Sequence, residues 1–207
     1  MATRVSEKKI LDTALDLAEQ KSWEAVRLHD VAKVLNVSLS DVHKVINDKQ
    51  ALVTLWFDSA DNVMLKAAES PAFIKHSLHQ RVHELIMVWL CALATHRTVT
   101  RQMFYSVLEP GQLHAQIPAF FHLNRTVQWI REAVHRDDIY VKRSIDEAAL
   151  TTLFTVTFIT WLYDNSKDST KTSQFLNKRL HNAEMIHSLV THWIAEPAKH
   201  LFERLHR

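Results

Sequence analysis

The chain has 207 residues, of which 47% are hydrophobic, and a formal net charge of +2 at pH 7. This length and hydrophobic content are sufficient to bury a sizeable core, as one compact fold or as a small head on a larger body. One Gly and four Pro argue against sheet-rich folds and phosphate-binding loops, because hairpin turns and such loops rely on Gly. The composition therefore predicts an all-α protein.

Location and catalysis are also restricted by the sequence. The single cysteine, Cys91, excludes an internal disulfide and is typical of a reducing cytoplasm. The first residues lack the apolar segment of a signal peptide, so a cytoplasmic location is expected. The sequence shows no nucleophile elbow, no Gly-rich phosphate loop and no recognisable pair of carboxylates, so neither catalysis nor a cofactor is expected.

Residues 28–49 have the pattern of two short helices joined by a tight turn. The first helix has one apolar stripe at i, i+3, i+4 and i+7, formed by Leu28, Val31, Ala32 and Leu35. Asn36 follows, and Asn tolerates the left-handed conformation that ends helices. Ser38 and Asp41 form a capping-box pattern that opens the second helix, whose buried side is Val42, Val45 and Ile46. This spacing is typical of a helix-turn-helix.

The flanking segments make the pattern more specific. An amphipathic helix from Ile10 to about Lys21 precedes it, and a long helix from about Asp48 to Glu69 follows it. Over about 45 residues the sequence resembles the N-terminal DNA-binding domain of TetR-family transcriptional regulators. The resemblance lies in the order and spacing of Trp23, Val31-Ala32, Val37-Ser38, Lys49 and Leu52. The sequence departs from the family pattern at Ser22, Val26, Asn36, His43 and Ile46.

The resemblance implies a homodimer with a helix-turn-helix head over residues 1–47 and a ligand-binding and dimerisation body over residues 48–207. It also implies ligand-responsive regulation of transcription by binding to double-stranded operator DNA. The residues that would face the DNA, mostly its phosphates, are Arg27, Ser38, Ser40, His43, Lys44 and Lys49. Residues 1–50 contain eight Lys or Arg and eight Asp or Glu, so binding should be weak or strongly salt-sensitive unless the acids face away from the DNA.

After the long helix that ends near Glu69, a break at Pro71 and a helix from about Ala72 to Thr95 are predicted. One face of this helix carries the apolar residues Leu78, Val82, Leu85, Ile86, Trp89 and Leu90. His76, His79 and His83 fall at i, i+3 and i+7, a spacing that would suit a metal ion. Since 14 His are scattered through the chain and no Cys or carboxylate pair lies nearby, no metal site is expected.

A short helix around residues 101–108, a loop at Glu109-Pro110-Gly111 and a helix from Ala119 to His135, opened by Pro118, are predicted next. Large side chains of the body are candidates to line a pocket for an apolar small molecule or a lipid: Trp89, Met103, Phe104, Phe121, Trp129, Phe154 and Phe158. An aromatic stripe at helical spacing is more often a packed core, and this alternative stays open.

Residues 145–163 are the most apolar segment, with 16 consecutive residues free of charge. The segment is shorter than the roughly 20 residues that cross a bilayer. A helix that is apolar on nearly every side must be buried against its own core and against a second partner. A homodimer interface is the simplest partner. In the TetR family the last two long helices form a four-helix dimer bundle, and this helix with Thr172–Ile194 would take their places.

Trp161 to Leu180 follow the pattern W-x-x-D-x-S-x-D-x-x-x-T-x-x-F-L-x-x-R-L. This pattern resembles the C-terminal part of the Coq-nine family of ubiquinone-biosynthesis accessory proteins, which has a TetR-like fold and holds lipid instead of DNA. The segment is also a helix stop and restart, because Asp164, Ser166 and Asp168 are typical turn and N-cap residues. The alternative function is therefore a lipid- or quinone-binding accessory protein with a helix-turn-helix that does not bind DNA.

The last residues, 197–207, have the pattern of a short basic amphipathic helix. One side is apolar, and the other carries Lys199, His200, Arg204, His206 and Arg207. Such a helix can lie on an anionic membrane surface, dock on the body or fray. The resemblance to the Coq-nine family implies the first of these, a peripheral membrane contact.

Overall fold

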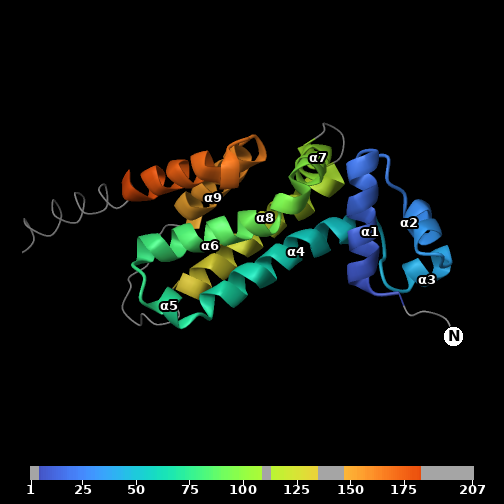
Figure 1. Cartoon of the computed structure of the whole chain (residues 1–207), viewed down its shortest axis with the longest axis horizontal. Coiled ribbons are helices and arrows are strands. Elements are labelled where there is room, and N and C mark those ends of the chain that lie inside the picture. Colours follow the sequence, from blue (N-terminus) through green and yellow to red (C-terminus); the bar gives the residue numbers. More distant parts are fainter. Residues whose placement is uncertain (1–4, 109–112, 135–146, 183–207) are drawn as a thin grey trace, which may run out of the picture.

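Every secondary-structure element in the described part of the chain is a helix. A computed structural model describes residues 5–108, 113–134 and 147–182, and its helices confirm the predicted all-α fold. The molecule is elongated, with a small N-terminal head at one end and a larger body at the other (Figure 1). None of the helices in these ranges is both long and apolar enough to span a membrane.

The head consists of α1 (Glu7–Gln20), α2 (Leu28–Val34) and α3 (Leu39–His43). The predicted first helix and helix-turn-helix are therefore present. Ser6 caps the start of α1, because its Oγ accepts a hydrogen bond from the N–H of Lys9. Helix α1 buries one apolar face against α2. Helix α2 in turn packs on α3, which is buried through Val42.

The turn between α2 and α3 is closed by local backbone bonds. Asn36 adopts the left-handed conformation with φ 54°, as predicted. The N–H of Val37 donates to the carbonyl of Ala32 at 3.0 Å and that of Asn36 to Lys33 at 3.2 Å, which is the Schellman arrangement for ending a helix. The chain is thereby turned sharply at a residue other than Gly, and α3 starts three residues later, at Leu39.

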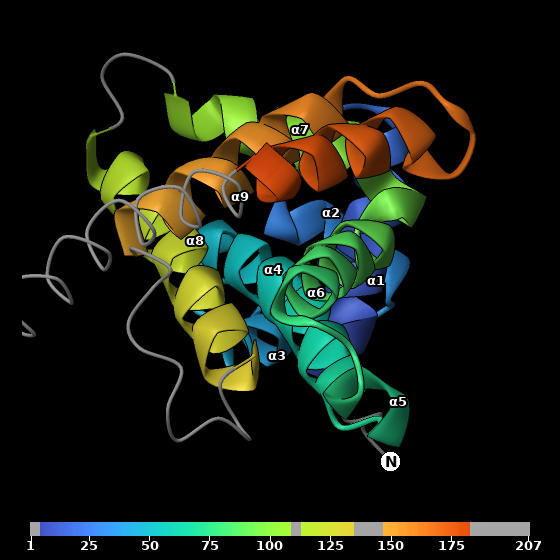
Figure 2. The ribbon, with the colours of Figure 1, turned by 90° about the vertical axis from the view of Figure 1, so that its left-hand side faces the viewer.

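The body is built around α4 (Lys49–Ala68), which starts in the head and packs on α6 (Leu78–Ala92) and α8 (Leu113–Val134). Figure 2 shows these helices from the far end of the body. The remaining elements are α5 (Pro71–Ile74), η1 (Ala94–His96), α7 (Arg97–Leu108), α9 (Glu147–Leu162) and η2 (Lys167–Ser169). A further helix, here called the C-terminal helix, covers residues 170–182 and lies beside α9 in both views (Figure 1 and Figure 2).

Two predicted helix starts are wrong. Helix α6 begins at Leu78 instead of Ala72, because Ser70 caps the short α5 and Ser77 forms a capping box with Gln80. Helix α8 begins at Leu113, so Pro118 lies inside it, where it removes one intrahelical hydrogen bond without ending the helix. The predicted loop at residues 109–111, the helix end beyond residue 182 and the basic tail at 197–207 lie outside the described residues.

Candidate functional site

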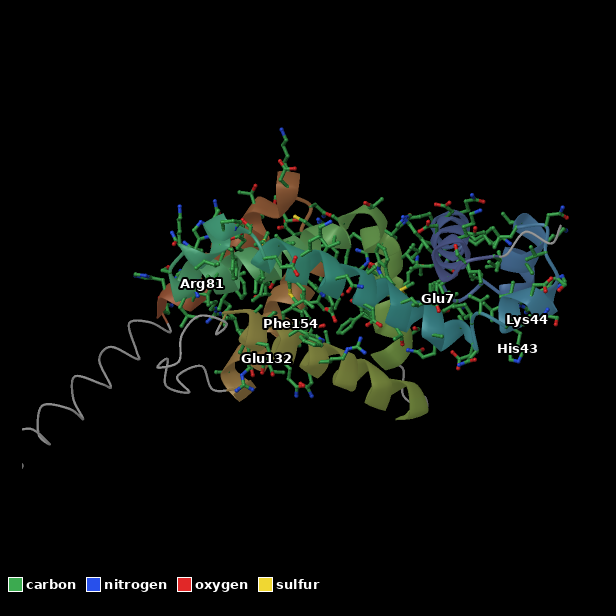
Figure 3. The ribbon with its side chains drawn as sticks, turned by 90° about the horizontal axis from the view of Figure 1, so that it is seen from below. Glu7, His43, Lys44, Arg81, Glu132 and Phe154 are labelled. Atoms are coloured by element: carbon green, nitrogen blue, oxygen red, sulfur yellow. The ribbon has the colours of Figure 1, made fainter. Side chains whose placement is uncertain are left out.

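The second helix of the helix-turn-helix, α3, lies at the outer end of the head. Figure 3 shows His43 and Lys44 at this end of the molecule, opposite Arg81 at the far end of the body. Side chains exposed along α3 and its flanks are Ser38, Leu39, Ser40, His43 and Lys44. The buried side of the same segment is anchored by Val42 and Ile46, which are almost fully buried in the core. This anchoring presents the exposed side to a partner.

A polar network occupies three of these positions. Ser38 Oγ accepts from the N–H of Asp41 at 3.1 Å and donates to Asp41 Oδ2 at 2.7 Å, so the predicted cap is present. Lys44 Nζ donates to Asp41 Oδ1 at 2.8 Å. The hydrogen bond from Lys44, followed by that from Ser38, lowers the pKa of the Asp41 carboxyl. The positive charge of Lys44 is thus balanced by a neighbour on the same helix.

Three predicted DNA-facing side chains are exposed and unengaged. Arg27 precedes α2, while Ser40 and His43 lie on α3. Within the described residues these side chains make no hydrogen bond or ion pair. They are therefore available to a ligand without breaking a contact in the head.

Lys49, at the start of α4, is placed differently. Its Nζ donates to the carbonyl oxygens of Trp23 and Glu24 and lies 4.8 Å from the centroid of the Trp23 ring. Burial lowers the pKa of the Lys49 ammonium. In this structure the charge is directed at the backbone of the head, whereas the sequence pattern implied that it faces DNA.

Gln102 of α7 makes a contact with the head that the sequence did not indicate. Its Oε1 accepts a 2.6 Å hydrogen bond from the backbone N–H of Trp23. His96 and Glu19 add a contact of 3.3 Å between the body and α1. These partners lie more than 70 positions apart in sequence, so no local pattern could have paired them.

The residues predicted to line a pocket are mostly packed against one another. Trp89, Met103, Phe154 and Phe158 are fully buried. The ring centroids of Trp89 and Phe154 lie 5.0 Å apart, and those of Phe104 and Phe158 lie 5.4 Å apart. Such spacing is that of an aromatic core with edge-to-face contacts. The packed-core alternative therefore describes these five residues in this structure.

The other two predicted pocket residues both belong to α8. Trp129 is 45% exposed on α8. It lines a surface cavity of about 310 Å³ together with Arg125, Gln128, Arg131 and Glu132, and not the aromatic core. Phe121 belongs to α8 as well, at a position where only the backbone is described.

Asp61 places a carboxylate beside the aromatic core. Its Oδ1 accepts hydrogen bonds from Trp89 Nε1 at 2.7 Å and from Thr126 Oγ1 at 2.8 Å. Burial raises the pKa of the Asp61 carboxyl, and these two hydrogen bonds oppose the rise. One acid thus links α4, α6 and α8. The sequence offered one signal: Asp61 shares a helical face with the apolar Met64 and Ala68 at i+3 and i+7.

The segment between α9 and the C-terminal helix forms a compact polar cluster around Asp164, here called the Asp164 knot. Asp164 Oδ1 accepts from the N–H and Oγ of Ser166, at 2.8 and 2.6 Å, and Oδ2 accepts from the N–H and Oγ1 of Thr172, at 2.8 and 2.6 Å. Burial raises the pKa of the Asp164 carboxyl, but these four hydrogen bonds outweigh burial and hold the pKa far below its ordinary range.

Arg97 ties the Asp164 knot to α7. Its guanidinium donates to the carbonyl of Asp164 and, at 2.7 Å, to Ser169 Oγ. It also lies 4.6 Å from the centroid of the Trp161 ring. The predicted helix stop and restart is present, since α9 ends at Leu162 and the C-terminal helix begins at residue 170. Helix α7 contacts both the head, through Gln102, and the Asp164 knot, through Arg97.

A solved structure of a TetR transcriptional regulator from Nitrosomonas europaea ATCC 19718 is 46% identical to the chain, with a TM-score of 0.78, and the match covers 86% of this chain and 98% of that one. The chain belongs to the TetR family of transcriptional regulators. Regulators of this family act as homodimers that bind DNA and are generally not enzymes. The predicted family and fold are confirmed.

Two more distant TetR structures share the fold. A TetR transcriptional regulator from Rhodococcus sp. RHA1 is 19% identical with a TM-score of 0.62, covering 85% of this chain and 93% of that one. The TetR-family repressor AlkX from Dietzia sp. strain DQ12-45-1b, implicated in biodegradation of n-alkanes, is 14% identical with a TM-score of 0.56, covering 89% and 98%. No curated protein matches the chain.

The COQ9 family, called Coq-nine above, matches residues 138–187 of this TetR-family chain. The described part of that segment contains α9, the Asp164 knot and the C-terminal helix. Three polar residues of the Trp161–Leu180 pattern lie in this segment, and Ser166 and Thr172 both donate to Asp164. The described structure therefore gives this pattern a structural role within a TetR fold.

The three histidines with metal-ligand spacing do not converge. His76 Nδ1 contacts Glu84 at 2.8 Å, His79 Nε2 contacts Asn177 at 2.8 Å, and His83 Nε2 contacts Ser173 at 3.2 Å. Over the ranges that the structure describes, no group of three or more His, Cys, Asp or Glu could hold a metal ion. The contacts of His79 and His83 instead attach α6 to the C-terminal helix.

Proposed function

We propose that this TetR-family regulator binds operator DNA as a homodimer through its helix-turn-helix and that an apolar ligand in its body changes this binding. The observation that supports it best is the exposed side of α3 at the outer end of the head, held by the buried Val42 and Ile46. In helix-turn-helix proteins this second helix enters the major groove. A ligand would act only through different affinities for two arrangements of the heads.

The proposed DNA contacts divide into two groups. Arg27, Ser38 and Lys44 suit phosphates, while Ser40 and His43 lie where base edges are contacted. Lys49 would contribute indirectly in this structure, because its ammonium supports the turn at Trp23. Two acids of the head are turned to other partners, Asp30 to Lys21 at 3.7 Å and Glu19 to His96 at 3.3 Å. This arrangement supports binding despite the balanced charge of residues 1–50.

The proposed homodimer would use α9 and the C-terminal helix. Four exposed positions fall at i, i+4, i+7 and i+11 on α9 and just beyond it: Thr152, Val156, Ile159 and Tyr163. Val156 is 41% exposed and Ile159 is 40% exposed, although the opposite face of α9 is buried in the core.

In sedimentation equilibrium, Ile159→Arg should shift a dimer toward monomer at micromolar concentration, whereas Val63→Arg on α4 should not. A monomeric wild-type protein would refute the dimer.

The experiment that tests DNA binding is fluorescence anisotropy of the full-length protein over a series of salt concentrations. One labelled duplex is the promoter next to its own gene, and the control is a random duplex of equal length. We expect the promoter to be favoured by a factor of roughly a thousand, with affinity that falls as salt rises. Lys44→Ala should weaken binding to both duplexes and reduce the salt slope by about one for each phosphate that the lysine no longer neutralises. Equal, weak binding to both duplexes would refute the proposal.

A second candidate function is that of a lipid- or quinone-binding accessory protein, and the observation that favours it is the COQ9 match at residues 138–187. The test is mass spectrometry of organic extracts from the protein purified without detergent. A stoichiometric lipid, together with equal binding to promoter and random DNA, would favour this candidate.

The predicted membrane contact of residues 197–207 has its own test, co-sedimentation of the protein with vesicles of anionic lipid. Deletion of residues 197–207 should abolish the binding to vesicles.

A further inference from the structure

Leu39 is a large apolar side chain exposed at the position where a helix-turn-helix protein meets base edges. It is the first residue of α3 and is 48% exposed. Val42 and Ile46 on the same segment are 0% and 2% exposed. These two side chains pack in the core of the head, whereas Leu39 does not. Its exposure therefore places an apolar group on the surface that the proposed function assigns to DNA.

Polar side chains next to Leu39 are already hydrogen-bonded within the head. Ser38 and Lys44 are both bonded to Asp41, at 2.7 and 2.8 Å. Only Leu39, Ser40 and His43 remain as exposed, unengaged side chains on α3 itself. None of these can form the bidentate bonds with which Arg or Asn select guanine or adenine. Base selection on α3 must then use a short hydroxyl, an imidazole and an apolar group.

We infer that Leu39 selects thymine by contact with its 5-methyl group, an inference that rests on the proposed DNA-binding function. The thymine methyl is the apolar group that a base pair offers in the major groove, and apolar side chains recognise thymine through it. The N-terminal turn of the recognition helix, where Leu39 lies, is the part that approaches base edges. Because the head carries balanced charge, phosphate attraction is small and each base contact accounts for a larger share of the affinity.

The test uses uracil, which pairs as thymine does but lacks the methyl group. The full-length protein first selects duplexes from a random pool. Each thymine conserved among the selected duplexes is then replaced by uracil, one at a time, and affinity is measured by anisotropy. For the wild type, uracil at one thymine of each half-site should weaken binding about fourfold per methyl group removed. Leu39→Ala should bind the thymine and uracil duplexes equally.

A matched control separates this effect from general loss of an apolar side chain. Val63 on α4 is 49% exposed, so Val63→Ala removes a comparably exposed apolar group far from the head. This variant should discriminate thymine from uracil as the wild type does. Uracil also alters duplex shape, but such an effect would persist in Leu39→Ala and is removed by comparing the two proteins.

The outcomes distinguish this inference from the function on which it rests. If no sequence is enriched from the pool, DNA recognition is refuted and the role of Leu39 with it. If sequences are enriched but contain no conserved thymine, or if wild type binds uracil duplexes equally well, only the inference is refuted. It is refuted too if Leu39→Ala, with an unchanged melting temperature, retains the full preference for thymine.

Discussion

The Oε1 atom of Gln102 in α7 accepts a 2.6 Å hydrogen bond from the backbone N–H of Trp23 in the turn after α1. The carbonyl oxygen of the same Trp23 accepts from Lys49 of α4. The backbone N–H and the carbonyl oxygen of Trp23 are thus both bonded by side chains of helices that belong to the body or lead into it. Because buried backbone groups are costly to leave unpaired, these two bonds resist a change in the position of the head.

The first prediction concerns Gln102. Gln102→Leu keeps the size of the side chain but leaves the N–H of Trp23 without its acceptor, so the free energy of unfolding should fall by about 1–2 kcal/mol. Amide hydrogen exchange at Trp23 should become faster, whereas exchange at the core residue Trp89 should change only with global stability. Gln102→Glu retains an acceptor oxygen and serves as the control. Unchanged exchange at Trp23 in the Leu variant would contradict the bridging role.

The second prediction separates the roles of two lysines in the head. Lys49→Met keeps the aliphatic stem but removes the donor to two carbonyls, and it should lower the free energy of unfolding by about 1 kcal/mol. Lys44→Met alters an exposed ion pair with Asp41 and should change stability by less than about 0.5 kcal/mol. Urea unfolding measures both variants. Equal stabilities would show that the bonds of Lys49 to the turn do not stabilise the head.

The third prediction concerns the buried Asp61. Asp61→Ala leaves Trp89 Nε1 and Thr126 Oγ1 without their acceptor and should cost about 1–3 kcal/mol. Asp61→Asn keeps the acceptor oxygen and removes the buried charge, so this variant should be more stable than the wild type at pH 7.

The pH dependence of Asp61 provides the control. Because the folded pKa of Asp61 is raised, its contribution to stability is complete below the unfolded pKa of about 4 and is lost as pH rises through the folded pKa. The advantage of Asp61→Asn should therefore shrink as pH falls from 7 toward 4, measured by urea unfolding. An advantage independent of pH would show that ionisation of Asp61 is not its cause.

The fourth prediction concerns the Asp164 knot. Asp164→Asn weakens four hydrogen bonds to a buried carboxylate and should lower the free energy of unfolding by about 2–3 kcal/mol at pH 7. The folded pKa of Asp164 is lowered, so its contribution is present above the unfolded pKa of about 4 and is lost as pH falls toward the folded pKa. The difference between wild type and variant should narrow below about pH 4.

A neighbouring acid supplies the matched control for the Asp164 knot. Asp168 is exposed and left-handed, with φ 52°, and Asn tolerates this conformation. Asp168→Asn should leave the free energy of unfolding within about 0.5 kcal/mol of the wild type. A similar loss in both variants would mean that net charge, and not the hydrogen bonds of Asp164, stabilises this segment.

The features that were predicted correctly depend on signals within a few residues. Asn36 ends α2 in the left-handed conformation, and Ser38 caps α3. The spacing of apolar residues identified α1, α2 and α3. The order of these helices, together with Trp23, Lys49 and Leu52, carried the resemblance to the TetR family. Helix α6 was misplaced because two competing caps, Ser70 and Ser77, lie close together, and its start depends on how α5 packs through Phe73.

The candidate site was only partly predictable for the same reason. The sequence by itself determined the all-α class, the helix-turn-helix and its exposed α3 positions, since periodicity and capping are local properties of the chain. Only the tertiary structure paired Gln102 with Trp23, buried Asp61 between Trp89 and Thr126, and separated Trp129 from the aromatic core. These outcomes depend on how helices distant in sequence pack together, and a side chain such as Lys49 takes its partner from that packing.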